Sequence, residues 1–267
     1  MQWEKLTAVE FARAVKESQG VTVVSVGVIE AHASHLPLGT DMLDAHWVAC
    51  RAAEREPAIV FPAYPFGVNI ETTHLPGGVS LHRELLFTLL ENICDEIARN
   101  GLEKIILHNG HGGNRYFLPL FVQMLTAKDK PYVVYYANLP SSQDPDILET
   151  DELGHACEWE TSKMLYIYEE LVKMDQAPSR PFKSLRRNQE LDEAGAYSPV
   201  DWYSMYPVMY VGDASKATAE KGKAFVEFEI DALVKFIRTI KADKITSKLQ
   251  KEFIKKRHDP SVPDEWD

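Results

Sequence analysis

The sequence is poor in cysteine, in basic residues and in long apolar runs, and each shortage argues against a class of protein. Its three cysteines, Cys50, Cys94 and Cys157, are widely spaced without a CxxC pair, which is typical of reduced thiols and argues against a cysteine-ligated zinc site. Lysine and arginine number 29 against 40 acidic residues, a net charge of -11, so neither nucleic acid nor an anionic membrane is expected as a partner. No segment approaches the length of a membrane span and the N-terminus has no apolar core like that of a signal peptide, so we expect a cytoplasmic protein.

What the chain does contain is ample material for one packed core. Of its 267 residues, 45% are hydrophobic and 10% aromatic, as in an ordinary globular protein. We expect one domain over residues 1–242 and a polar C-terminal extension over residues 243–267. The basic cluster Lys251–Arg257 in that extension is interpreted as a solvated helix end.

Strand-like and helix-like segments alternate along the chain without repeats. The expected strands are Val21–Val28, Ala58–Ala63, Lys104–His108 and Tyr132–Ala137. The expected helices are Thr7–Glu17, Met42–Arg55, Arg83–Asn100, Arg115–Ala127, Glu158–Tyr168 and Ser215–Ala242, the last opened by Asp213 or Ser215 as its cap. Repeated strand-helix units predict an α/β fold: a single three-layer α/β/α domain with a mainly parallel central sheet.

The stretch that follows the first expected strand concentrates chemistry-bearing residues. Glu30, His32, His35 and Asp41 lie at or just beyond the strand's end, where ligands bind in open α/β sheets. Glu30 and His32 are two residues apart and point to the same side of an extended chain. Two carboxylates and an imidazole suit zinc, manganese or iron(II) rather than calcium. The alternative is a hydrogen-bonded Glu30–His32 pair, with Asp41 only capping the next helix.

A second cluster follows the strand Lys104–His108, in the glycine-rich loop from Asn109 to Asn114. Glycines between a strand and a helix can bind phosphate, but this loop lacks the lysine and the spacing of a P-loop. The glycines instead indicate backbone that approaches a site closely, with His111 as a ligand. His108, inside the apolar run, is interpreted as a core histidine.

The third cluster spans Gly154 to Ser162, where a loop enters a helix. His155 and Glu160 are five residues apart and do not share a helix face, yet a loop-borne His155 and a first-turn Glu160 could face one cavity. The alternative is that Glu160 and Thr161 serve only helix capping and the helix dipole.

Together the clusters resemble the creatininase (creatinine amidohydrolase) family. Its E-x-H-x-x-H-L-P-x-x-T-D stretch matches Glu30 to Asp41, and its N-G-H-G-G-N loop matches Asn109 to Asn114. Its H-A-G-x-x-E-T-S element matches His155 to Ser162, with Cys157 at the second small position, and Gly212 to Thr218 resembles the segment before the family's last helix. The resemblance covers roughly residues 1–240 and implies a single α/β/α domain, assembled as a homohexamer.

The resemblance also implies two divalent metal ions per chain, zinc and/or manganese or iron(II). It places Glu30, Asp41 and His111 on one ion, and His32 and Asp41 on the other, with Asp41 bridging. Creatininase carries a glutamate two residues after the loop histidine, where this chain has Gly113, so Glu160 is expected to supply the missing carboxylate.

The chemistry implied is hydrolysis. Two ions about 3.5–4 Å apart would bind a bridging hydroxide, which attacks the carbonyl of a small cyclic amide or related substrate. His155 is the candidate acid that protonates the leaving group, because a histidine can give and take protons near neutral pH. His35 is expected to orient a ligand.

Departures from the family motifs indicate a substrate other than creatinine. Creatininase has a tyrosine in contact with substrate directly after the loop histidine, where this chain has Gly112, and its E-H-x-x-F-P-G-T stretch reads Glu71 to Gly78 here. Alternatives within the family are a ring-opening hydrolase of a diketo-inositol (3-dehydro-scyllo-inosose), a formamide deformylase and a peptidase of redox-cofactor maturation. The aromatic segment containing Tyr197, Trp202, Tyr203 and Tyr206 is either a pocket wall or lid, or a subunit interface.

The rival from another class is a non-catalytic metal-binding or small-molecule-binding protein. Five potential ligands accompanied by a separate acid candidate, His155, favour the enzyme, since a purely structural site needs no such acid.

Overall fold

The computed structural model describes residues 1–140, 147–150 and 152–263. Its strands are β1 (Val21–Val26), β2 (Ile59–Val60), β3 (Lys104–Asn109) and β4 (Val133–Ala137). Its α-helices are α1 (Ala8–Glu17), α2 (Thr40–Arg55), α3 (Arg83–Arg99), α4 (Asn114–Met124), α5 (Glu158–Ile167), α6 (Gln189–Glu193), α7 (Asp201–Met205), α8 (Ala219–Ala242) and α9 (Thr246–His258). The 3-10 helices are η1 (Trp3–Lys5), η2 (Ile70–Thr72), η3 (Leu125–Ala127), η5 (Glu169–Leu171) and η6 (Met174–Gln176).

The four strands form one sheet in the order β2-β1-β3-β4, and each neighbouring pair is parallel. In the central pair, Ser25 lies opposite His108 and Val26 opposite Asn109, so β1 and β3 end at the same level. The segments that follow these two strands therefore leave the sheet side by side. The predicted parallel sheet is confirmed.

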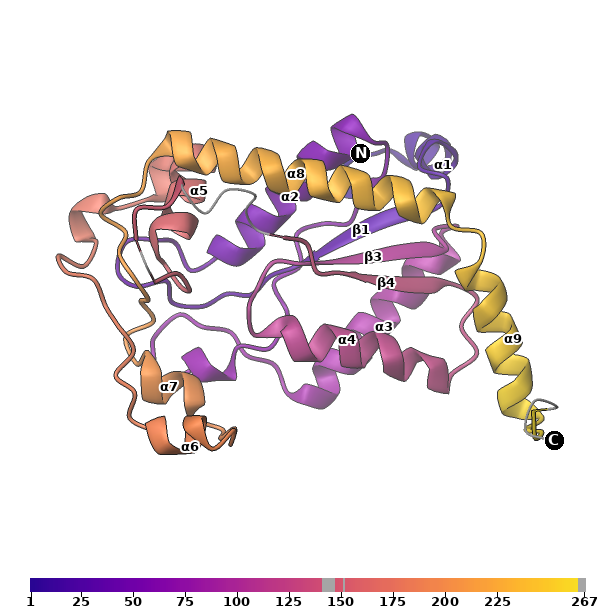
Figure 1. Cartoon of the computed structure of the whole chain (residues 1–267). Coiled ribbons are helices and arrows are strands. Elements are labelled where there is room, and N and C mark those ends of the chain that lie inside the picture. Colours follow the sequence, from indigo (N-terminus) through magenta and orange to yellow (C-terminus); the bar gives the residue numbers. More distant parts are fainter. Residues whose placement is uncertain (141–146, 151, 264–267) are drawn as a thin grey trace.

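Helices cover both faces of the sheet (Figure 1). Val23 and Ile106 belong to a core cluster with α2 and α8, whereas Val24 and Leu107 pack in a second cluster with α3 and α4. Successive residues of a strand point to opposite faces, so a strand that is apolar throughout, such as β1, needs a helical layer on each side. The predicted three-layer α/β/α architecture is confirmed.

The expected start of the last long helix is wrong. This helix, α8, begins at Ala219, and its cap is Thr218, whose hydroxyl accepts a hydrogen bond from the Lys221 amide at 3.2 Å. The Asp213 carboxylate instead accepts from the Ser215 amide at 2.8 Å. Asp213 therefore forms a local turn, which competes with helix initiation.

Two further expectations differ at the ends of elements. The second strand is confined to Ile59–Val60 because Pro62, just beyond it, has no amide to donate to a ladder. Asp41 does not cap α2: the helix begins at Thr40 after Gly39, so Asp41 lies in its first turn. Its carboxylate is thereby left for other partners.

The C-terminal extension forms the helix α9, which contacts β4. The Gln250 side-chain amide donates to the carbonyl oxygens of Lys130 and Tyr132 at 3.0 and 2.8 Å, and Arg257 pairs with Asp129. The basic residues, read as a solvated helix end, occupy its last turns. The domain boundary at residue 242 stays a prediction.

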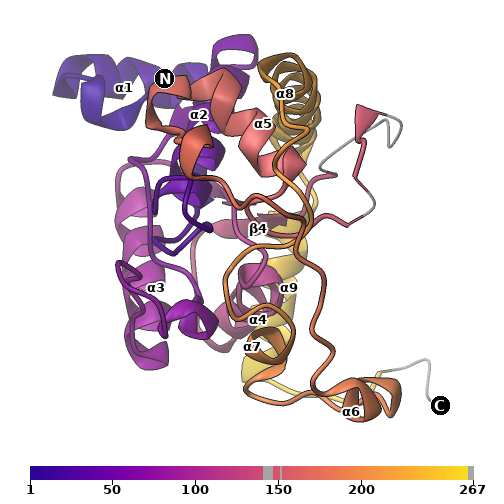
Figure 2. The ribbon, with the colours of Figure 1, turned by 90° about the vertical axis from the view of Figure 1, so that its left-hand side faces the viewer.

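The excursion between α5 and α8, residues 168–218, carries η5, η6, α6 and α7. Figure 2 shows α6, in this excursion, at the opposite end of the view from α2 and α5. Among the described residues, no helix has both the length and the apolar character needed to cross a membrane.

Candidate metal centre

A cluster of three histidines and three carboxylates lies beyond the carboxyl ends of β1 and β3. Glu30 and His32 follow β1, and His111 follows β3. The first turn of α2 adds Asp41, the loop before α5 adds His155, and the first turn of α5 adds Glu160. Every residue of the predicted ligand set is brought together, along with the predicted acid.

Glycines let α2 approach the strand ends closely enough to deliver Asp41. A Cβ atom on Gly27 would lie 2.5 Å from the Met42 Cα, and one on Gly110 would lie 2.5 Å from the Ala45 Cβ. Real Cβ atoms do not approach other atoms so closely, so only glycine fits at either position. The glycine of the N-G-H loop thus has a packing role beside Asp41.

One group of potential ligands consists of Glu30, Asp41 and His111. The Nδ1 atom of His111 lies 3.3 Å from a Glu30 carboxylate oxygen and 2.7 Å from Asp41 Oδ2. One ligand atom from each residue lies within 4.8 Å of the other two. The three can therefore surround a single ion.

A second group shares Asp41 and adds His32 and Glu160. His32 Nε2 lies 3.1 Å from Asp41 Oδ1 and 3.8 Å from Glu160 Oε2. Asp41 thus presents Oδ1 to one histidine and Oδ2 to the other, as a bridging carboxylate requires. Glu160 Oε2 also accepts a hydrogen bond from the Ala156 amide at 2.5 Å, which fixes its orientation.

Each histidine of the cluster has one ring nitrogen bonded to a backbone carbonyl. His32 Nδ1 lies 3.3 Å from the Glu30 carbonyl oxygen, His111 Nε2 lies 3.0 Å from that of Val68, and His155 Nε2 lies 2.7 Å from that of Ala31. A carbonyl only accepts, so each of these nitrogens carries the proton. The other nitrogen of each ring then faces the carboxylates, the arrangement found around metal-ligating histidines.

The Glu30 carboxylate has no partner of its own. The residue is completely buried, and neither carboxylate oxygen makes a hydrogen bond within the described part of the chain. Asp41 Oδ2 has the His111 ring nitrogen beside it, at 2.7 Å. Buried charges are costly unless they are paired or coordinate a metal, and this donor set of nitrogen and oxygen atoms fits a transition-metal ion.

The carboxylates shift the pKa of two histidines upward in the metal-free protein. Burial opposes the charged form of His32, but Asp41, Glu160 and Glu30 raise its pKa to about 9. Against the same cost of burial, Glu30 and Asp41 raise the pKa of His111 well above its usual range. The cluster therefore holds protons where cations would bind, and metal ions would displace them.

His155 behaves differently from these two histidines. Its ring stacks on that of His32 with centroids 4.1 Å apart, and its Nδ1 lies 3.7 Å from a Glu30 oxygen. Burial and the neighbouring His32 lower its pKa to about 4, so it is neutral near pH 7, and the expected pKa near neutrality is wrong for the metal-free protein. It also forms a third group of potential ligands with Glu30 and His32.

The backbone beside His32 and His155 is held in an uncommon conformation. Ala33 and Ala156, the residues after these histidines, have φ values of 50° and 52°, and Met209 has 50°. The Ala33 amide donates to the Met209 carbonyl at 2.8 Å, and the Val211 amide donates to the His155 carbonyl at 2.8 Å. Left-handed conformations of residues other than glycine cluster at functional sites, where surrounding contacts maintain them.

The remaining predicted residues lie around the cluster. His35 is buried, and its Nε2 lies 2.9 Å from the Thr161 hydroxyl, next to Glu160. Glu71, in η2, reaches His111 with 3.9 Å between Oε1 and Nε2. A Cβ atom on Gly112 would meet nothing within 4 Å, so this position borders open space. His108 is buried beside Ser25, as expected of a core histidine.

Of two further features around the cluster, the sequence left the first open and missed the second. The indole of Trp202 lies edge-on to His155, with ring centroids 6.1 Å apart, and donates to the Met209 sulfur at 3.1 Å. The aromatic composition of that segment was the only sequence signal for an aromatic wall beside His155. The second feature is a buried ion-pair cluster around Lys163, which no spacing in the sequence indicated.

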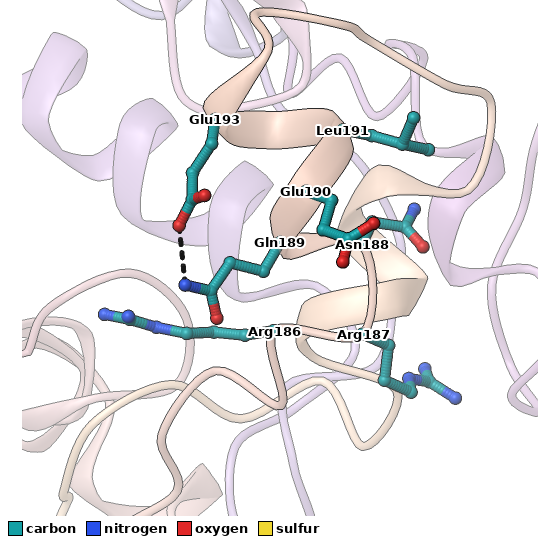
Figure 3. Close-up of a pocket in the computed structure, with 7 residues that line it drawn as sticks. All are labelled: Arg186, Arg187, Asn188, Gln189, Glu190, Leu191 and Glu193. Atoms are coloured by element: carbon teal, nitrogen blue, oxygen red, sulfur yellow. Dashed lines mark hydrogen bonds between the residues drawn. The ribbon is translucent and has the colours of Figure 1, made fainter.

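A separate cavity of about 580 Å³ lies against α6, remote from the cluster in sequence (Figure 3). Its lining includes Gln189, whose side chain donates to Glu193 at 2.6 Å, and the exposed Leu191. None of the clustered histidines or carboxylates contributes to it. We therefore place the chemistry at the ends of the strands.

Comparison with known proteins decides the family. The sequence profile described as creatinine amidohydrolase matches residues 4–237. The chain belongs to the creatininase family. It is 26% identical over 259 residues to creatinine amidohydrolase from Pseudomonas putida, covering 88% of this chain and 95% of that protein. It is 27% identical over 241 residues to 3-dehydro-scyllo-inosose hydrolase from Thermotoga maritima, covering 82% and 76% of the two chains.

Solved creatininase structures share the fold. A structure described as "Creatininase Mn" superposes with a TM-score of 0.74 at 25% identity, covering 91% of this chain and 99% of that one. A creatininase variant described as Zn-Zn type gives a TM-score of 0.73 at 26% identity, with coverage of 91% and 98%. This member of the creatininase family is thus a hydrolase of the amidohydrolase type, and its cluster of histidines and carboxylates supports a divalent-metal site.

Proposed function

We propose that this chain is a two-metal hydrolase that cleaves a bond beside the carbonyl carbon of a small molecule other than creatinine. The observation that carries the proposal is the Glu30 carboxylate, which is fully buried without a hydrogen-bond partner among the described residues and faces histidine nitrogens. A buried carboxylate needs a cation beside it, and a metal ion would replace the protons that His32 and His111 hold here.

We assign one ion to Glu30, Asp41 and His111, and the other to His32, Asp41 and Glu160. The support is that the two groups share Asp41 through different oxygens, and that Glu160 lies where its sequence position allows. Mixed imidazole and carboxylate ligands favour zinc, manganese or iron(II). When bound, such ions polarise a carbonyl oxygen and lower the pKa of a water ligand to about 7.

His155 is proposed to move the proton. Because its pKa is about 4 in this environment, its free Nδ1 is unprotonated near pH 7 and can first accept a proton from the attacking water. It then donates that proton to the departing nitrogen or oxygen. Its Nε2, bonded to the Ala31 carbonyl, keeps the ring oriented throughout.

His35 is proposed to hold Glu160 in place indirectly. Its hydrogen bond to Thr161 fixes the first turn of α5, and the Thr161 hydroxyl also lies 3.2 Å from the Ala156 carbonyl. Burial lowers the pKa of His35 to about 4, so it stays neutral and adds no charge beside the ligands. Such supporting contacts tune metal affinity.

The substrate-facing side supports a substrate unlike creatinine. Gly112 leaves open space where creatininase places a tyrosine, and Glu71 adds a partly exposed carboxylate beside His111. Trp202 supplies an aromatic wall next to His155. This combination suits a small substrate with hydroxyl or amino donors, as in the diketo-inositol of the Thermotoga maritima relative. The alternative substrates are a formamide and a small cyclic amide.

We further propose a cytoplasmic homo-oligomer, a homohexamer by the family resemblance. Tyr116, Leu120 and Met124 are exposed at four-residue spacing along α4 and form an apolar stripe on its outer surface. Such a stripe is suited to contact with another subunit. Light scattering on the purified protein measures the assembly directly.

The decisive experiment is elemental analysis of the purified wild type and of Glu160→Gln. We expect about two transition-metal ions per chain in the wild type and about one in the variant, since glutamine keeps the shape but ligates weakly. Cyclic amides, formamides and sugar-derived ketones then form the substrate panel. A folded wild type that takes up neither zinc nor manganese would leave a small-molecule-binding protein and end the hydrolase proposal.

A further inference from the structure

A second buried charged cluster lies one helical turn behind the metal ligands. Lys163 of α5 forms ion pairs with Asp44 of α2 and with Glu229 of α8, the latter at 2.8 Å. Lys163 is only 3% exposed, and its ammonium also lies 4.3 Å from the centre of the Trp159 ring. Three helices therefore meet at one buried cation.

The position of this cluster along the helices connects it to the metal centre. Asp44 follows Asp41 by three residues on α2, and Lys163 follows Glu160 by three residues on α5. Residues three apart lie on the same face of a helix. The ion pair between Lys163 and Asp44 thus joins α2 and α5 on the faces that carry two of the assigned metal ligands.

We propose that Lys163 and Asp44 are positioning residues for the metal centre: their ion pair fixes the separation of Asp41 and Glu160, on which affinity for the second ion depends. The inference rests on the proposed two-metal function and adds a supporting element to it. Neither residue contacts a metal, and both act through the helices that carry the ligands.

The packing of α5 against α8 limits how far α5 can move. A Cβ atom on Gly222 of α8 would lie 1.8 Å from the Ser162 carbonyl oxygen, so α5 lies directly against the α8 backbone and cannot retreat. Because α2 packs on β1 and on α8, the ion pair adds a direct tie between two helices that are each already supported. A buried ion pair adds little net stability compared with apolar packing, so a geometric role explains its presence better than a stabilising one.

Two matched substitutions test the inference. Asp44→Asn weakens the link between α2 and α5, because a neutral amide holds the ammonium less strongly than a carboxylate, and it leaves Lys163 paired with Glu229, so no buried cation is stranded. Glu229→Gln removes one carboxylate charge from the same cluster but keeps the link. Zinc titration against a chelating indicator measures both dissociation constants in each protein, and circular dichroism verifies folding.

We expect Asp44→Asn to weaken the second zinc ion about 10- to 100-fold, the range known for residues that orient metal ligands, with much less effect on the first. Glu229→Gln should change either constant less than about threefold, because the α2–α5 link is intact. Wild-type constants in Asp44→Asn, or equal weakening by both substitutions, would overturn the positioning role while leaving the two-metal function standing. A wild type that binds no zinc would overturn both.

Discussion

The cluster around Asp41 and the cluster around Lys163 are both buried between α2 and α5, and both contain carboxylates. In the second, a lysine neutralises its neighbours: it pairs with Asp44 and Glu229 and stays charged because their attraction outweighs the cost of burial on its pKa. In the first, the cations beside Glu30 are protonated histidines, His32 and His111, whose pKa values the carboxylates raise. A lysine cannot be exchanged for a metal ion, whereas histidines can release their protons and bind one. The second cluster is therefore a fixed ion pair and the first is a candidate metal site.

The largest effect should come from the carboxylate that both assigned ions share. Asp41→Asn removes a ligand from each ion, so metal content should fall from about two per chain toward none, and hydrolysis to background. Elemental analysis and the substrate panel measure both. Asp231→Asn, a carboxylate on α8 that is 73% exposed and pairs with Arg55, is the control and should match the wild type. Full metal content in Asp41→Asn would exclude a bridging role.

The next effect separates proton transfer from metal binding within the first cluster. His155→Gln should lower kcat by about 10²- to 10⁴-fold, the range for loss of a general acid or base, while the metal content stays at the wild-type value. His82→Gln, at a histidine whose side chain is 95% exposed, should have no effect. Loss of an ion together with activity would make His155 a ligand, as its contact with Glu30 and His32 also permits.

A smaller effect tests the contact that orients His111. A Cβ atom on Gly113 would lie 2.5 Å from His111 Nε2 and 2.6 Å from the Val68 carbonyl oxygen, so Gly113→Ala should disturb the hydrogen bond between them. We expect about 10- to 100-fold weaker binding of one ion by zinc titration. Gly112→Ala, which meets nothing within 4 Å, is the matched control. Equal constants in the two variants would show that this contact does not set the affinity.

The sequence sufficed for the architecture and for the membership of the first cluster. Apolar strands separated by amphipathic helices predicted the three layers, because a strand such as β1, buried throughout, must be covered on both faces. The motifs predicted that Glu30, His32, Asp41, His111, His155 and Glu160 would converge, and in the structure they do. Their roles as ligands and acid stay predictions.

The sequence could not predict contacts made by chain segments far apart. The Val68 carbonyl that orients His111 is a backbone atom 43 residues away and carries no side-chain signal. Trp202 reaches His155 only because the excursion folds back, and nothing in the sequence pairs Lys163 with Glu229, 66 residues later. The cap of α8 was missed because Asp213, Ser215 and Thr218 are all acceptable caps, and tertiary context selects among them.

The smallest expected effect is a change of folding stability with pH, which should differ between the protein with bound metal ions and the chelated protein. In the chelated protein the pKa of His32 is raised to about 9 from 6.5, so its contribution to stability is complete below pH 6.5 and is lost as pH rises through 9. Despite burial, His32 and His111 lower the pKa of Asp41 below its usual range. Asp41 therefore stays ionised between pH 6.5 and 9 and does not make stability depend on pH there. The loaded protein should show the opposite slope, because ions bind deprotonated histidines and bind better at higher pH. Urea midpoints at pH 6.5 and 9, with zinc and with chelator, measure both slopes, and parallel slopes would mean that no ion binds at His32.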